Sequence, residues 1–307
     1  MALSRVGIGV DMELTTDAVV DELAGRGMSF DRAAAELDRI IRGADDDEFL
    51  SLLVRAGCIP ERYRHDSTEE KLYAKAMDAI VAESLRRIGY AAEVSQERSN
   101  SADVVAAGGS PEHSLVADAK AFRLSRTALN PKDYKIEALS KWRKGADYAL
   151  LVAPIAGYPE GESRLYVEAA RYQVTLLSYS HLALMIASES GPSPLASVWA
   201  RGVDSTSVTL GALQYWTSLD SSLRDALSWD QANWAEARRE YFQSLLFTAE
   251  EELAYFDQVK GDIAAMSREE LVDVAVDALK IDSRMRTIRA RVARSRALMN
   301  AMEDRQQ

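Results

Sequence analysis

Residues 114–122 read Ser-Leu-Val-Ala-Asp-Ala-Lys-Ala-Phe, and this stretch decides the fold. Its mostly apolar character predicts a β-strand. Because side chains alternate along a strand, Asp118 and Lys120 project from the same face, about 7 Å apart along it. Isolated burial of either charge is costly. The strand therefore carries either a structural ion pair or a functional site.

A second carboxylate, Asp103, opens the preceding predicted strand, Ala102–Ala107. If the two strands pair as a hairpin, Asp103 comes near Asp118, and the two carboxylates repel each other unless a cation lies between them. Mg²⁺ favours such oxygen ligands, with the Ala119 carbonyl as a further candidate ligand, and we expect Mn²⁺ to substitute. Lys120 would hold or deprotonate an attacking water and offset charge on phosphorus. The pattern predicts phosphodiester hydrolysis.

The acid–x–Lys triplet alone is weakly specific, because the chain contains three copies: Glu69–Lys71, Asp118–Lys120 and Asp133–Lys135. Only the second is predicted to lie on a strand. It is also the only copy that follows an aspartate on the preceding predicted strand, one short hairpin earlier in the chain. On the local pattern alone, a structural ion pair remains an alternative to a metal site.

The surrounding segments predict an α/β core. A capping-box start at Ser67–Glu70 opens a helix that ends near Gly89. The order that follows is three strands, a helix and a strongly apolar strand, with one more strand and a helix beyond. These segments are Tyr90–Ser95, Ala102–Ala107, Ser114–Phe122, helix Asp133–Lys144, Tyr148–Ala153, Val174–Ser178 and a helix from Ser180.

Helical segments flank this core on both sides. Three short helices are predicted before it, and long amphipathic patterns cover Gln231–Val259 and Ser267–Met302 after it. We therefore expect an N-terminal helical region over 1–66, an α/β core over 67–190 and a mainly helical region over 191–307. Packing and dimerisation, with some DNA contact, are the expected roles of the last region.

Composition excludes several classes of protein. Hydrophobic residues make up 47% and charged residues 28% of the 307 residues, which is ordinary globular composition. Cys58 is the single cysteine, so internal disulfides and multi-cysteine zinc sites are excluded. The chain has no 18-residue apolar run, and Met1–Val10 lacks the apolar core of a signal peptide. We expect a soluble cytoplasmic protein without membrane contact.

The distribution of charge matters more than its sum of −11, which has the wrong sign for an indiscriminate nucleic-acid binder. Residues 119–144 contain eight basic and two acidic side chains. Lys280–Arg296 contains seven basic side chains opposed only by Asp282. An acidic body with two basic stretches would approach a polyanion in a restricted orientation. Solvated helix faces explain the two stretches equally well.

Taken together, Asp103 and Asp118–Ala119–Lys120, within this order of helices and strands, resemble the PD-(D/E)xK nuclease superfamily. A dense run of further blocks is similar to the HindIII family of type II restriction endonucleases. The blocks are Ser67–Leu72, Leu115–Thr127, Lys132–Lys135, Ala138–Ser140, Trp142–Arg143 and Ala153–Pro159. The resemblance is thinner outside about Ser67 to Pro159.

This resemblance implies a restriction-endonuclease-like fold, a mixed sheet flanked by helices. It also implies a homodimer that cleaves both strands of palindromic double-stranded DNA with Mg²⁺, and a cognate methyltransferase in the same system. Catalytic roles carry over to Asp103, Asp118 and Lys120, although Ala102 stands where the superfamily usually has proline. Asp133 lies in a block that looks functional in the family, or simply complements a helix dipole. Glu70 is either an accessory acid from the preceding helix or the cap of its own helix.

The loop after Lys120 contains side chains suited to reading bases. Arg123 and Arg126 match guanine edges, and Asn130 matches adenine. Lys132 and Lys135 are expected to contact phosphates, which position a protein without selecting sequence. If this loop follows the family pattern, AAGCTT is the first recognition sequence to test.

Two other functions fit the same scaffold. One is a repair or recombination nuclease that recognises DNA structure instead of sequence. The other is a DNA-binding protein on a decayed nuclease fold, against which the intact Asp103, Asp118 and Lys120 argue. His65, His113 and His181 are too scattered in the sequence to predict a metal cluster, and Cys58 is expected to be a small packed residue.

Overall fold

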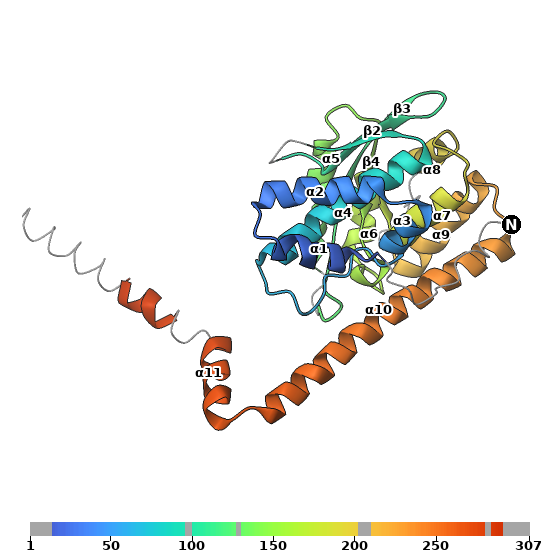
Figure 1. Ribbon diagram of the computed structural model, residues 1–307. Coiled ribbons are helices and arrows are strands. Elements are labelled where there is room, and N and C mark those ends of the chain that lie inside the picture. The colour runs from blue at the N-terminus through green and yellow to red at the C-terminus, as the bar shows by residue number, and fades with distance from the viewer. Residues whose placement is uncertain (1–13, 96–99, 127–129, 202–209, 280–283, 291–307) are drawn as a thin grey trace, which may run out of the picture. The chain divides into compact units, whose positions relative to one another are not determined.

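The computed structural model describes residues 14–95, 100–126, 130–201, 210–279 and 284–290. Within these ranges one mixed five-stranded sheet forms in the order β1-β2-β3-β4-β5 (Figure 1). The strands are β1 Ala91–Val94, β2 Val104–Gly108, β3 His113–Ala119, β4 Tyr148–Val152 and β5 Val174–Leu177. β1, β2 and β3 pair antiparallel, whereas β3, β4 and β5 pair parallel. The predicted mixed α/β sheet flanked by helices is confirmed.

Helices precede, connect and follow these strands. Those before the sheet are α1 Thr16–Gly25, α2 Phe30–Gly43, α3 Asp46–Val54 and α4 Thr68–Ile88. Those between and directly after the parallel strands are α5 Ile136–Trp142, α6 Arg164–Arg171 and α7 Tyr179–Ala187. The remainder comprises α8 Leu195–Arg201, α9 Ala212–Ala226, α10 Gln231–Ala265 and α11 Arg268–Ala278.

Helix α4 positions the site because it packs against β1, β2 and β3, while α1 and α2 pack on α4 in turn (Figure 1). The helix begins where the Ser67 side chain accepts a hydrogen bond from the Glu70 backbone N–H. It ends at Gly89, whose φ of 107° in the left-handed region suits glycine. Both ends match the boundaries expected from the sequence.

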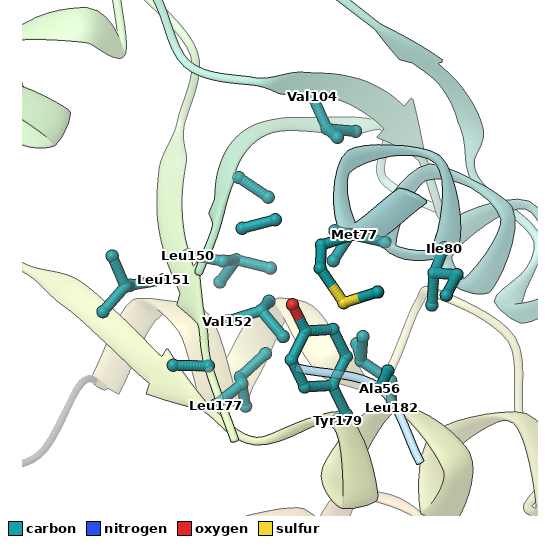
Figure 2. Packing of buried hydrophobic residues seen from close by; sticks show 14 of the residues in the cluster. Ala56, Met77, Ile80, Val104, Leu150, Leu151, Val152, Leu177, Tyr179 and Leu182 are labelled. Atoms are coloured by element: carbon teal, nitrogen blue, oxygen red, sulfur yellow. The ribbon is translucent and has the colours of Figure 1, made fainter. Parts of the chain in front are cut away.

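The core between the sheet, α4 and α7 is apolar. Figure 2 shows Leu150 and Val152 of β4 on the same side of the strand as Met77 and Tyr179, with Leu151 turned the other way. This alternation is the pleat of a strand buried on both faces, and all three β4 residues are buried. The Tyr179 hydroxyl points into this interior.

The helix expected over Asp133–Lys144 is divided in the structure. Pro131–Tyr134 forms a short 3₁₀ turn, begun by Asn130, whose side chain accepts a hydrogen bond from the Lys132 N–H. Lys135 then adopts a φ of 50°, and α5 starts only at Ile136. Asp133 therefore does not lie in the first turn of an α-helix, which corrects the expectation from the sequence.

The chain divides into two compact units, Met1–Glu252 and Leu253–Gln307. None of the helices in the described ranges combines the length and the apolar character that crossing a membrane requires. Some expectations fall outside the described residues: Met1–Val10, Thr127 of the family-like block, and most of the basic stretch after residue 279.

Candidate active site

Asp103 and Asp118 lie opposite each other at one end of the β2–β3 hairpin. The register pairs Val104 with Ala117, so one further step places Asp103 across from Asp118. Asp103 Oδ2 accepts a hydrogen bond from the Ala119 backbone N–H at 3.2 Å. The predicted hairpin is confirmed, and it brings the two carboxylates to the same end of the sheet.

Lys120 follows β3 directly, and its ammonium group contacts the Asp118 carboxylate. The Lys120 backbone N–H donates to the Val152 carbonyl at 2.8 Å, which continues the β3–β4 ladder by one residue. Asp118 is only 2% exposed, whereas the Lys120 side chain is 18% exposed. The ion pair thus lies where the core meets solvent, and a substrate can approach the lysine.

A third carboxylate, Asp78 of α4, joins this end of the sheet. It is buried and accepts a hydrogen bond from Lys75 Nζ at 2.8 Å. Its pKa is affected by the charges of both Asp103 and Lys120, so its carboxylate shares their surroundings. Sequence reasoning missed Asp78. The available signal was an aspartate enclosed by Ala76, Met77, Ala79 and Ile80 on a helix whose apolar face is buried.

Burial raises the pKa of two of these carboxyl groups. For Asp118, burial and the Asp103 carboxylate outweigh the Lys120 ammonium, and the pKa rises to about 7. For Asp78, burial and again Asp103 outweigh Lys75 and Lys120, with the same result of about 7. The charges of three carboxyl groups and two ammonium groups therefore act on one another where little water reaches them. The two ammonium groups do not fully neutralise the carboxylates.

This arrangement fits a divalent cation. The donors are carboxylate oxygens, which Mg²⁺ prefers. Asp118 Oδ2 is buried, and the Lys120 ammonium lies against it. An added positive charge would stabilise the ionised forms of Asp78 and Asp118 and so lower their pKa values.

We predict that Mg²⁺ stabilises the protein more at about pH 8 than at about pH 6. The pKa values of Asp78 and Asp118 are about 7 in the folded chain, above the ordinary value of 3.8. The protonated forms of the two carboxyl groups therefore contribute their full stabilisation of the fold below pH 3.8. This contribution is lost as the pH rises through 7. Cation binding offsets this loss only where the carboxyls are ionised. The difference in Mg²⁺-induced Tm shift between the two pH values should be on the order of 3 °C.

Thermal unfolding with and without Mg²⁺ at both pH values measures this effect. In an Asp118→Asn variant the pH dependence of the Mg²⁺ effect should shrink, because one of the titrating groups is gone. A Tm shift of equal size at both pH values in the unmodified protein would contradict the assignment.

Glu70, the acid expected from the preceding helix, has different partners. Its carboxylate accepts hydrogen bonds from Arg123 and from the Asp66 backbone N–H. It lies eight residues before Asp78 on α4, which corresponds to about 12 Å along the helix axis. Asp78, and not Glu70, is therefore the α4 carboxylate on which the charges of Asp103 and Lys120 act.

The two candidate arginines for base reading are held by carboxylates. Arg123 pairs with Glu70 and also donates to the Tyr63 carbonyl at 2.8 Å. Arg126 pairs with Asp133, and its guanidinium lies 4.4 Å from the centre of the Phe122 ring. A polyanionic ligand would therefore compete with protein carboxylates for both arginines.

The other candidate DNA contacts, Asn130, Lys132 and Lys135, are exposed. Lys135 lies 5.9 Å from the centre of the Trp142 ring. These side chains share the segment that leaves β3 and leads to α5, close in sequence to Lys120. Their placement is compatible with phosphate contact.

The histidines and the cysteine have local partners. His113 is buried against the Tyr90 hydroxyl at 2.9 Å, and His181 lies between Ser178 and Asp220. His65 is exposed and, with Asp66 and Glu70, forms a group whose ligand atoms are near enough to share a cation. Burial raises the pKa of Cys58 to about 12, so its thiol stays protonated and unreactive at neutral pH.

The class of protein follows from fold and site together. Helix α4, three antiparallel strands, helix α5 and parallel strand β4 follow in order. Asp103 precedes β2, Asp118 and Ala119 end β3, and Lys120 follows directly. This is the restriction-endonuclease-like fold with its PD-(D/E)xK arrangement.

Comparison with known proteins specifies the family. The model of the HindIII restriction endonuclease family matches residues 15–292, and the chain belongs to that family. The type II restriction enzyme HindIII of Haemophilus influenzae is 38% identical over 157 residues, which cover 51% of this chain and 52% of that enzyme. The match thus spans about half the length of this curated relative.

A much weaker likeness is found to the solved structure of the restriction endonuclease FokI. It has 14% identity and a TM-score of 0.32, and it covers 52% of this chain and 31% of that one. A similarity at this level bears on neither the fold nor the function.

Proposed function

We propose that this protein is a type II restriction endonuclease that hydrolyses phosphodiester bonds in double-stranded DNA with the help of Mg²⁺. The observation that carries the proposal is the convergence of Asp78, Asp103, Asp118 and Lys120 at one end of the β2–β3 hairpin. Membership of the HindIII restriction endonuclease family supports it.

Asp103 and Asp118 are the groups that would hold Mg²⁺, together with Asp78 and the Ala119 carbonyl. When bound, Mg²⁺ polarises a phosphate oxygen and lowers the pKa of water, and Mn²⁺ is expected to supply the same chemistry. Asp118 has a double role, because it also holds the Lys120 ammonium at the solvent boundary.

Lys120 acts on the reacting groups themselves. Its ammonium orients the attacking water and offsets the negative charge that builds up on the phosphate in the transition state. The water loses a proton to solvent as its oxygen bonds to phosphorus, and the leaving oxygen takes up a proton from solvent as its bond to phosphorus breaks. The low exposure of Asp118 strengthens these electrostatic interactions, because little solvent screens them.

DNA recognition is assigned to the segment after Lys120. Arg123, Arg126 and Asn130 would read base edges, and Lys132 and Lys135 would contact phosphates.

Release of Arg126 from Asp133, and of Arg123 from Glu70, would accompany DNA binding. Asp133 would then act by holding Arg126 in the absence of DNA.

A two-fold symmetric homodimer would present two such sites to a palindromic sequence, since each subunit meets the same half-site. AAGCTT is the sequence that the family resemblance favours. A protective methyltransferase in the same cytoplasm completes the proposed restriction system.

Digestion of plasmid DNA of known sequence tests the proposed function. We expect discrete fragments whose ends map to a single short palindrome, with Mg²⁺ required and chelation abolishing cleavage. A plasmid in which every AAGCTT is altered is the matched substrate for the sequence assignment. A smear, or cleavage confined to junctions and flaps, would instead support a structure-specific nuclease. Binding without any cleavage would support a decayed nuclease fold.

A further inference from the structure

The side chain of Tyr179 contacts the backbone of the proposed catalytic lysine. Tyr179 is the first residue of α7, it is buried, and its hydroxyl donates a hydrogen bond to the Lys120 carbonyl at 2.9 Å. Burial raises the pKa of the phenol well above its ordinary value, and nearby Asp78 adds to the rise. The hydroxyl therefore remains a neutral donor and is no candidate for a general base.

The hydrogen bond from Tyr179 lies where the backbone pairing of β3 with β4 ends. Lys120 donates its N–H to the Val152 carbonyl of β4, but it lies one residue beyond β3. The chain after it is held by a different segment, because the Phe122 N–H donates to the Gly57 carbonyl at 2.8 Å. Tyr179 therefore supplies the hydrogen bond that fixes the Lys120 carbonyl between these two anchors.

The Tyr179 ring is itself firmly placed. A Cβ added at Gly57 would come within 2.5 Å of the ring, so glycine is needed for this close approach. Figure 2 shows the ring beside Met77 and Val152, with Leu182 near its base. The first turn of α7 is anchored as well: His181 Nδ1 accepts from the Ser178 N–H, and its Nε2 lies 3.1 Å from Asp220.

We propose that Tyr179 is a positioning residue for Lys120. By holding the Lys120 carbonyl, it sets the peptide orientation from which the ammonium reaches Asp118. The preceding carbonyl, that of Ala119, belongs to the peptide unit whose N–H donates to Val152, and that bond orients it. The inference rests on the proposed nuclease function, but the geometry of the Lys120 peptide can be measured without it.

Tyr179→Phe tests the proposal, because it keeps the ring and removes only the hydroxyl. Tyr158→Phe is the matched control. Tyr158 is similarly buried, and its hydroxyl donates to the carbonyls of Leu151 and Leu177 at 3.1 and 2.9 Å instead of to the Lys120 carbonyl. Both variants lose a buried phenol–carbonyl hydrogen bond, so a general loss of stability should affect them alike.

Two measurements distinguish a positioning role of Tyr179 from a purely structural one. The single-turnover cleavage rate should fall about 10- to 100-fold in Tyr179→Phe with little change in DNA affinity, and stay near the original value in Tyr158→Phe. Hydrogen exchange of the backbone amides of residues 120–122, measured without metal, should be about fivefold faster in Tyr179→Phe only.

Equal cleavage rates in the two variants, or unchanged exchange at residues 120–122, would overturn the proposal. If the unmodified protein fails to cleave DNA, the proposed function fails, and the exchange experiment still decides whether Tyr179 fixes the Lys120 peptide.

Discussion

Replacing Asp118 by asparagine should lower the single-turnover rate of DNA cleavage by about 10³-fold or more, which corresponds to about 4 kcal/mol of transition-state stabilisation. The substitution removes a proposed metal ligand and, at the same time, the charge that holds the Lys120 ammonium. The fold should not suffer. The introduced amide would be neutral beside Asp103, so the repulsion that contributes to the raised pKa of Asp118 disappears. We therefore expect the metal-free variant to be at least as stable as the unmodified protein.

Asp147→Asn provides the control for this result. Asp147 is exposed and accepts hydrogen bonds from the Ser114 N–H and hydroxyl at 2.7 and 2.9 Å, near the opposite end of β3 from Asp118. Its loss should lower stability slightly and leave the cleavage rate unchanged. A cleavage-competent Asp118→Asn protein would remove the catalytic assignment altogether.

The second large effect is expected at Asp78. In Asp78→Asn the cleavage rate should fall by about 10²-fold, because a carboxylate that shares the surroundings of Asp103 and Lys120 is lost. Glu70→Gln, on the same helix, should change the rate of the chemical step less than tenfold. Glu70 pairs with Arg123, so its substitution should act mainly on DNA affinity.

Two measurements distinguish the roles of Asp78 and Glu70. They are the cleavage rate at saturating enzyme and the DNA affinity in the absence of cleavage. If Glu70→Gln slowed the chemical step more than Asp78→Asn, the accessory acid would be the one that the sequence indicated. An unchanged rate in Asp78→Asn would remove Asp78 from the chemical step.

The sequence predicted the sheet well because its signals are local. Strong turn residues at Gly108–Pro111 separate two apolar strands, and the capping residues Ser67 and Gly89 mark both ends of α4. Alternation along residues 114–122 placed Asp118 and Lys120 on one face, and the structure brings them into contact.

The parts that could not be predicted depend on tertiary packing. Asp78 is surrounded in sequence by apolar residues, and only the docking of α4 on the sheet brings it within range of the Asp103 charge. The division of the helix after Asn130 depends on the left-handed backbone of Lys135, which no propensity of lysine indicates. No sequence pattern indicates a role for Tyr179, since its partner Lys120 is 59 residues away.

The central claim is that the carboxylates at the end of the β2–β3 hairpin bind a divalent cation. Crystals grown with Mn²⁺ test it directly, because the anomalous signal of Mn²⁺ locates the ion without reference to activity. The account predicts a peak bounded by Asp78, Asp103 and Asp118 that disappears in Asp118→Asn. An Mn²⁺ peak at His65, Asp66 and Glu70, with none beside Asp118, would contradict it.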